Sequence, residues 1–316
     1  MRLSLSGPVR RTAPVALLLA VLPLAVPAPA AARTRDAGSI CSSDDHPRLA
    51  SRLSDDIGSA LAGRAGTVSV GLWDRDTGTW CGVGYTRHYD SASVVKAMVM
   101  AAVLRRAQEA GRHLTARENR LITAMITRSD NDATTVLWRG LGPDRVQRFL
   151  GLAGLSHTVL NDGGSWGLTR ITAQDEMQVL ALFDSDNEVL SPASRAYGMR
   201  QLASVVATQR WGTPAGAPSG VGVHVKNGWL PRSTHGWRVH SIGDFTRPDR
   251  PGYRLVVLSH DNRTMAYGVA TIERVARVVH RDLDQPVEEP EEEPSDGPAY
   301  PPAEEPALEP EDLLFK

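Results

Sequence analysis

Ser93 and Lys96 open a long apolar run, Val94 to Ala110, whose composition predicts a buried helix. A step of three residues puts the serine hydroxyl and the lysine amine on one face of such a helix. A serine hydroxyl becomes a nucleophile when a base takes its proton, and lysine can be that base once burial or a nearby charge lowers its pKa. The spacing therefore predicts nucleophilic catalysis, although it also fits a helix cap followed by an unrelated lysine.

Lysine is rare enough in this chain for its positions to be informative. Only three of the 35 basic residues are lysines, namely Lys96, Lys226 and Lys316. The others are arginines, which stay protonated at any relevant pH and cannot act as bases. Lys96 and Lys226 therefore mark the two places in the expected folded domain where arginine would not serve.

Two further polar motifs follow in the chain. Ser129-Asp130-Asn131 comes after a predicted helix that ends near Thr127, in a loop where these residues also make good turn and cap formers. Lys226-Asn227-Gly228 ends a predicted strand, Val221 to Val225. A lysine there would supply a fixed positive charge, and the glycine would let a ligand approach the backbone closely.

In their order and on these elements, the three motifs resemble those of class A β-lactamases and the related penicillin-binding D-alanyl-D-alanine peptidases. The likeness extends over about residues 46–282 and is especially close from Met125 to Thr135. It implies a sheet lobe packed on a helical lobe, with the site between them. It further implies a serine hydrolase that forms an acyl-enzyme with β-lactams or D-alanyl-peptide-like amides and needs no cofactor.

The resemblance gives the catalytic roles to three side chains. Ser93 would attack the substrate carbonyl, and Lys96 would receive its proton. Ser129 would pass a proton to the leaving nitrogen. The backbone N–H groups of Ser93 and Trp229 would form an oxyanion hole.

The resemblance also implies a set of substrate-binding residues. Asn131 would contact the substrate amide. Lys226 would hold the substrate carboxylate and adjust the reactivity of Ser129. Asn227, Gly228 and Trp229 follow Lys226 in the chain and would also contact the substrate. Trp166 and Trp229 would line the cleft.

Three departures from the family pattern affect the expected chemistry. Asn227 stands where the family has Thr or Ser, and the 36 residues from Ser93 to Ser129 are fewer than usual. No Glu occurs from Asn119 to Asp175, the stretch in which class A enzymes carry the residue that activates the deacylating water. Asp162 is the nearest acid in a suitable place. Without a replacement for that Glu, the acyl-enzyme should form and then hydrolyse slowly.

Other functions stay open at this point. A D,D-carboxypeptidase, another small amide or ester hydrolase, or a non-catalytic cell-wall module that keeps the cleft would fit the same motifs. Gly163-Gly-Ser165-Trp-Gly167 also matches the nucleophile elbow of α/β-hydrolases. An elbow needs a strand before its serine and a helix directly after it, whereas the region upstream here is predicted to be helical.

Hydrophobic periodicity predicts an α+β fold in which both ends of the chain build an antiparallel sheet beside a helical lobe. We expect a sheet lobe from residues 46–92 and 220–282 and a helical lobe from residues 93–219, within one domain at 34–284. Expected helices cover about 46–62, 94–110, 115–127, 132–140, 143–150, 172–183 and 265–282. Expected strands cover a hairpin at 67–83 and the segments 221–225, 237–244 and 254–259.

The first 33 residues have the layout of a secretory signal peptide, with arginines before an apolar run and small residues after it. The run falls short of the roughly 20 apolar residues that span a bilayer, so a membrane anchor is the weaker alternative. The sequence leaves the choice between the general and the twin-arginine export route open. We therefore expect a secreted or cell-wall protein.

Cys41 and Cys81 are the two cysteines of the chain, and in an oxidising compartment they predict a disulfide. The nine histidines form no known metal-binding motif with them, so no metal is expected. Residues 285–316 combine eleven acids with many prolines and predict a disordered tail.

Charge also limits the partners. Residues 34–284 hold 30 basic and 25 acidic residues, a mild excess that suits an anionic small molecule rather than nucleic acid. We expect a monomer that binds a β-lactam or a peptidoglycan-type peptide.

Overall fold

Strands from the two ends of the chain meet in one sheet in the computed structural model, which describes residues 39–285. Six antiparallel strands follow the order β1-β3-β2-β8-β7-β6, so the α+β fold expected from the sequence is confirmed. Their bounds are β1 Cys41–Ser42, β2 Thr67–Asp74, β3 Thr79–Val83, β6 Gly222–Pro231, β7 Trp237–Thr246 and β8 Tyr253–Asn262.

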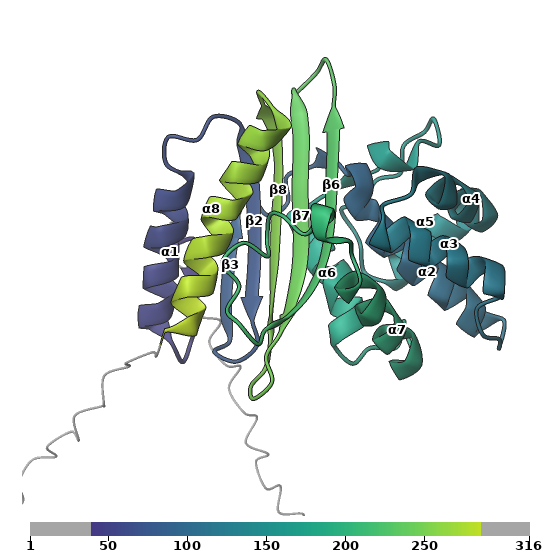
Figure 1. Cartoon of the computed structure of the whole chain (residues 1–316), viewed down its shortest axis with the longest axis horizontal. Coiled ribbons are helices and arrows are strands. Elements are labelled where there is room, and N and C mark those ends of the chain that lie inside the picture. Colours follow the sequence, from purple (N-terminus) through teal and green to yellow (C-terminus); the bar gives the residue numbers. More distant parts are fainter. Residues whose placement is uncertain (1–38, 286–316) are drawn as a thin grey trace, which may run out of the picture. The chain divides into compact units, whose positions relative to one another are not determined.

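Two long helices cover one face of this sheet. The helices α1 (Pro47–Leu61) and α8 (Met265–Asp284) lie side by side there, although they come from opposite ends of the described chain (Figure 1). Side chains alternate along β8, so that Leu255 and Val257 pack with the residues of α1 and α8 while Val256 packs on the opposite side. The sheet is therefore apolar on both faces.

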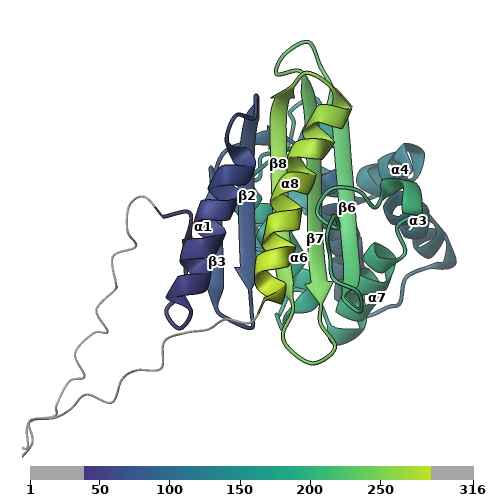
Figure 2. The same ribbon diagram turned by 60° about the vertical axis from the view of Figure 1, so that its left-hand side comes forward.

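The remaining helices lie on the other side of the sheet (Figures 1 and 2). They are α2 Val95–Glu109, α3 Ala116–Thr127, α4 Asn131–Leu141, α5 Pro143–Leu152, α6 Ala173–Asp184 and α7 Pro192–Ala203, with short turns η1 Ala92–Val94, η2 Trp166–Leu168 and η3 Ala207–Gln209. A small second sheet pairs β4 (Tyr89–Asp90) with β5 (Arg170–Ile171). Every residue from Val95 to Leu104 in α2 is buried, so this helix is the centre of the helical part.

Besides the short strands β1, β4 and β5, which were not expected, one strand and one helix differ from the sequence prediction. The strand β6 does not end at Val225 but continues to Pro231, which places Lys226-Asn227-Gly228 inside it. Asn and Gly disfavour strands by propensity, but pairing with β7 continues through all three residues and overrides that preference. The helix α7 was not expected, because only Gly198 and Leu202 of its side chains are buried and its apolar period is weak.

The two cysteines form the expected disulfide. Cys41 and Cys81 face each other in the β1–β3 pair, and both are buried. In the part of the chain from residue 39 to 285, no helix has the length and apolar character to cross a membrane. The expected signal peptide and the expected tail, apart from Gln285, lie outside the described residues.

Candidate active site

Ser93 lies in η1, where the chain turns from the small sheet into the buried helix α2. One backbone and one side-chain hydrogen bond hold this turn, since Ser91 N donates to Thr169 O at 2.8 Å and the His240 ring Nε2 lies 2.9 Å from Asp90 O. Ala92 has a positive φ of 47°, which is uncommon for a residue with a side chain and marks a constrained turn. The Ser93 side chain is half-buried, so it faces partly toward solvent.

Lys96 is the second residue of α2 and is completely buried, with an exposed fraction of 0%. Its Nζ donates to Ser129 O at 2.7 Å, to Ser129 Oγ at 3.0 Å and to Asn131 Oδ1 at 2.7 Å. Burial lowers the pKa of Lys96 to about 7, against the opposing effect of the Asp130 charge. Near neutral pH a large fraction of this lysine is therefore uncharged and able to accept a proton.

The second motif joins α3 to α4 and has two functions. Asp130 caps α4, because its carboxylate accepts from Ala133 N at 2.7 Å. Ser129 adopts a positive φ of 57°, and Asn131 begins the helix. The cap thus fixes the turn that points Ser129 and Asn131 at Lys96.

Lys226 approaches the same serine from the sheet. It is completely buried, and its Nζ donates to Ser129 Oγ at 3.1 Å and to Asn227 O at 2.8 Å. Burial, and after it the charge of Lys96, hold the pKa of Lys226 well below its ordinary value. The structure therefore brings the three motifs together at one hydroxyl, Ser129 Oγ.

Gly228 lets β6 pass directly beside η1. A Cβ at this position would lie 2.7 Å from Ser93 N and 2.8 Å from Val94 N, too close for any side chain. Because β6 is the edge strand of the sheet, its open edge runs beside the start of α2. Glycine is required here by the close approach of two backbones.

Asn227 and Trp229 differ in how they relate to the cleft. The Asn227 side chain is fully buried and donates through Nδ2 to Gln209 O at 2.9 Å and Trp211 O at 2.8 Å, so it is turned away from Ser129. Trp229 is half-buried and lies 5.9 Å from Trp211 between ring centroids. The sequence did not single out the 209–211 segment, and no local signal in it predicts its contact with β6.

Asp162 and Ser165 lie in an exposed turn before η2. Within residues 39–285, no hydrogen bond links Asp162 to Ser93 or Lys96. Ser165 follows this turn rather than a strand, so the nucleophile elbow is excluded. Trp166, however, reaches the site, because its ring centroid lies 4.9 Å from Lys96 Nζ and its Nε1 donates to Thr135 Oγ1 at 3.2 Å.

Lys96, Lys226 and Ser129 are placed so that protons can be transferred through the Ser129 hydroxyl. Ser129 Oγ accepts from both lysines, which leaves its own hydrogen free to be donated toward the cleft. Among the described residues, none forms a hydrogen bond with the Ser93 hydroxyl, so its link to a base must form when substrate binds. Catalytic hydrogen bonds often tighten in this way only in the substrate complex.

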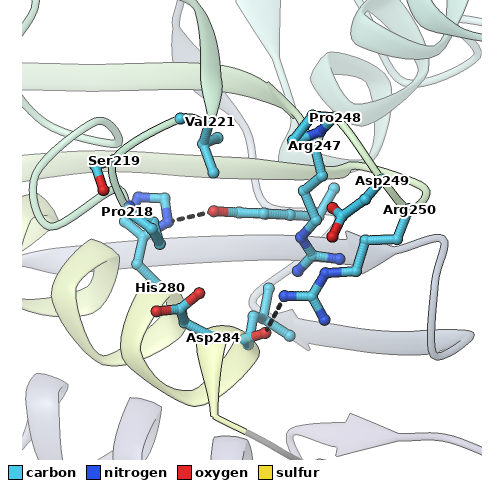
Figure 3. A pocket seen from close by; sticks show the side chains of 12 residues that line it. Pro218, Ser219, Val221, Arg247, Pro248, Asp249, Arg250, His280 and Asp284 are labelled. Atoms are coloured by element: carbon cyan, nitrogen blue, oxygen red, sulfur yellow. Dashed lines mark hydrogen bonds between the residues drawn. The ribbon is translucent and has the colours of Figure 1, made fainter.

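A separate cavity of about 260 Å³ lies between the β7–β8 turn and α8 (Figure 3). Both arginines that line it are paired, since Arg247 pairs with Asp74 at 2.9 Å and Arg250 pairs with Asp76 at 3.4 Å. His280 bridges Tyr253 and Thr213 O, each at 2.7 Å. These contacts are structural, and the cavity is not part of the site around Ser93.

Known proteins share both sequence pattern and fold with this chain. A family model described as the beta-lactamase enzyme family matches residues 52–119 and 110–283. The crystal structure of a β-lactamase from Xanthomonas campestris pv. campestris aligns with a TM-score of 0.64 and 20% identity, over 74% of this chain and 98% of that one. A comparison with the curated proteins found no match.

Reconstructed ancestral enzymes are also similar. An ancestral class A β-lactamase, GNCA, aligns with a TM-score of 0.62 and 23% identity, over 72% of this chain and 99% of that one. A variant of the class A β-lactamase reconstructed for the last common ancestor of Gram-negative bacteria was solved with bound 5(6)-nitrobenzotriazole. It aligns with a TM-score of 0.60 and 24% identity, over 73% of this chain and 98% of that one. At these identities the structures show a shared fold.

Proposed function

We propose that this chain, which belongs to the beta-lactamase enzyme family, is an exported serine hydrolase. Its Ser93 would be acylated by β-lactams or D-alanyl-peptide-like amides. The observation that carries the proposal is the convergence of Lys96 and Lys226 on the Ser129 hydroxyl, beside the turn that holds Ser93. The buried Cys41–Cys81 disulfide supports export to an oxidising compartment.

Acylation would proceed as a balanced proton transfer. The neutral Lys96 amine takes the proton of the Ser93 hydroxyl while Ser93 Oγ attacks the carbonyl carbon of the substrate. The carbon–nitrogen bond then breaks, and Ser129 gives its proton to the leaving nitrogen while it regains one from a lysine ammonium. The half-buried position of Ser93 beside the edge strand leaves room for the backbone N–H groups of Ser93 and Trp229 to bind the oxyanion.

Substrate binding would rest on two polar groups. Asn131 uses Oδ1 for Lys96, so its amide Nδ2 remains to donate to a substrate carbonyl. Lys226 would meet the substrate carboxylate, whose negative charge favours the protonated form of this buried amine. Asn227 would act indirectly, by fixing the 209–211 segment against β6.

Slow deacylation is the distinguishing part of the proposal. In the described chain, no carboxylate hydrogen-bonds to Lys96 or to Ser93, and the Asp130 carboxylate caps α4 instead. A water near the acyl group would therefore lack a strong base other than Lys96 itself.

The lack of a carboxylate bonded to Ser93 or Lys96 in the described chain also favours a second candidate function, that of a D,D-carboxypeptidase. Its natural substrate would be a peptide that ends in D-alanine, and a β-lactam would then act as a long-lived inhibitor. Asp162 stays a candidate for deacylation only if the exposed turn that carries it moves toward Ser93.

Parallel assays of the mature protein distinguish these functions. We expect weak turnover of a chromogenic cephalosporin, and D-alanine release from a muropeptide would identify the carboxypeptidase. Fast, full cephalosporin turnover would contradict slow deacylation. Ligand binding that is equal in wild type and Ser93→Ala, with no hydrolysis of any substrate, would instead identify a non-catalytic binding module.

A further inference from the structure

Three potential metal ligands gather at the end of the sheet where β6 turns into β7 (Figure 1). His235 lies in that turn, and His260 and Asp261 lie at the end of β8. One ligand atom from each of the three lies within 4.8 Å of the others. His235 and His260 are 25 positions apart in the sequence, which explains why no spacing motif revealed the group and why no metal was expected.

The backbone holds the turn firmly against β8. Asp261 N donates to His235 O at 2.7 Å, and Gly236 forms a bridge with Asn262. A Cβ on Gly236 would lie 2.7 Å from Asn262 O, so the two segments are in close contact. The three ligand side chains are therefore presented by a fixed framework.

The distances fit a small transition-metal ion. His235 Nδ1 lies 2.9 Å from Asp261 Oδ1, and His260 Nε2 lies 3.6 Å from Asp261 Oδ2. The two histidines approach different oxygens of this carboxylate, and the ligand atoms of a tetrahedral zinc ion with bonds near 2.0–2.1 Å lie roughly 3.3 Å apart, so the group within 4.8 Å would close slightly around an ion. The His235 and His260 rings are stacked with centroids 4.6 Å apart, so binding requires the His235 ring, which is 57% exposed, to turn its nitrogen toward the ion.

Neighbouring groups orient the ligands. Thr67 Oγ1 donates to Asp261 Oδ2 at 3.0 Å, and the Tyr89 ring packs on the His260 ring with centroids 4.8 Å apart. Arg238, a cation close to His260, is paired with Asp90 at 2.8 Å. Such outer contacts to ligand side chains are typical of metal sites.

Backbone conformation at the site adds an independent observation. His235 and Asp261 have positive φ values of 57° and 61°, and only four non-glycine residues in the described chain do so. Positive φ at residues with side chains costs free energy and is concentrated at functional sites. We propose that His235, His260 and Asp261 bind one divalent transition-metal ion, of which Zn²⁺ is the test case, with a position left open for water or a further ligand.

Imidazole ligands set the expected selectivity. Two histidines and one carboxylate suit Zn²⁺, Ni²⁺ or Cu²⁺, whereas Mg²⁺ prefers a shell of oxygen ligands. None of the hydrogen bonds of Lys96 and Ser129 in the described chain involves these three ligands, so metal binding can be measured independently of hydrolysis.

Calorimetric titration of the tag-free full chain with ZnCl₂ tests the proposal. We expect one Zn²⁺ per chain at this site and no comparable binding of MgCl₂. His235→Ala and His260→Ala should each weaken Zn²⁺ binding by at least about tenfold, because even loss of an outer-shell partner has an effect of that size. The exposed His113→Ala is the matched control and should bind as wild type does.

Because free carboxylates can bind Zn²⁺ weakly, the difference between variants decides the outcome. No Zn²⁺ binding by wild type, or equal binding by wild type and His235→Ala, would overturn the proposal. His235→Ala removes a largely exposed side chain and should fold normally, which its metal-free melting temperature checks. The result therefore stands even if His260→Ala, whose residue is more buried, fails to fold.

Discussion

At the residue scale, the site depends on two amines held close together in a buried environment. Lys96 and Lys226 both donate to Ser129 Oγ, at 3.0 and 3.1 Å. Removing two ammonium groups from water and placing them side by side disfavours their charged forms. The same geometry that costs electrostatic free energy thus produces a neutral lysine that can act as a base. An arginine at either position would stay charged.

The rate of acylation should follow the titration of Lys96. Its pKa of about 7 means that the neutral, active form increases with pH through the neutral range. We expect the rate constant to rise about tenfold per pH unit below this pKa and to level off above it. Stopped-flow acylation between about pH 5.5 and 8.5 measures this, and a flat profile would contradict the role of Lys96.

Lys96→Arg is the matched variant, because arginine carries a positive charge at every pH tested and cannot accept a proton. Its acylation rate should fall by about 100- to 10,000-fold, the usual contribution of general base catalysis. A rate near that of wild type would show that another group takes the proton.

Residue types predicted the members of the site better than their orientations. Lys96, Ser129 and Lys226 converge as their motifs suggested. The Asn227 side chain, by contrast, points to the 209–211 segment, because its amide finds two backbone carbonyls there. The contact between Trp166 and Lys96 and the grouping of His235 with His260 depend on tertiary packing that no local spacing encodes.

At the element scale, the candidate site depends on the close approach of the edge strand β6 to η1. Gly228 allows a contact that any larger residue would prevent. Asp130 caps α4 and fixes the turn that carries Ser129, which faces Lys226 of β6. The site is thus formed by a strand, a helix start and a helix cap, each placed by backbone interactions.

Gly228→Ala should disrupt this contact. The new methyl group would meet the backbone nitrogens of Ser93 and Val94, which have no flexible side chain that could move aside. We expect a loss of about 1–3 kcal/mol in the free energy of unfolding from overpacking and about a 100-fold slower acylation from misplacement of Ser93. Urea denaturation and acylation kinetics measure the two effects.

Gly151→Ala is the control for this change. Gly151 lies in α5 with no atom within 4 Å of a Cβ built there. Alanine favours helix over glycine by about 1 kcal/mol, so this variant should be slightly more stable and fully active. Equal behaviour of the two variants would contradict the account of Gly228.

The elements themselves were largely predictable, with two instructive exceptions. Strong periodicity identified α1, and a long apolar run identified α2. The sequence did not predict that β6 continues through Lys226-Asn227-Gly228, because pairing with β7 rather than strand propensity maintains this part of the strand. The helix α7 buries only Gly198 and Leu202, although Ser191 and Pro192 form a recognisable helix start.

At the scale of the whole molecule, the two ends of the described chain are joined through the sheet and its covering helices. The disulfide links β1 to β3 at one edge, and β6 with its site residues forms the opposite edge. Stability and catalysis should therefore respond separately to changes at the two edges.

Removing the disulfide should destabilise the protein without affecting acylation. Cys41 and Cys81 are 40 residues apart, and closing a loop of that size contributes roughly 2–4 kcal/mol to the free energy of unfolding. Urea denaturation of the Cys41→Ser, Cys81→Ser double variant measures the loss. A large fall in acylation rate under native conditions would contradict the independence of the two edges.

The account as a whole depends on whether Ser93 becomes acylated and releases its product slowly. Intact mass spectrometry of the protein after mixing with a penicillin tests this directly, with Ser165→Ala as the control for the other candidate serine. We predict a persistent adduct of one β-lactam mass in wild type and in Ser165→Ala, and none in Ser93→Ala. An adduct that survives in Ser93→Ala, or a wild type that shows neither adduct nor turnover, would contradict the account.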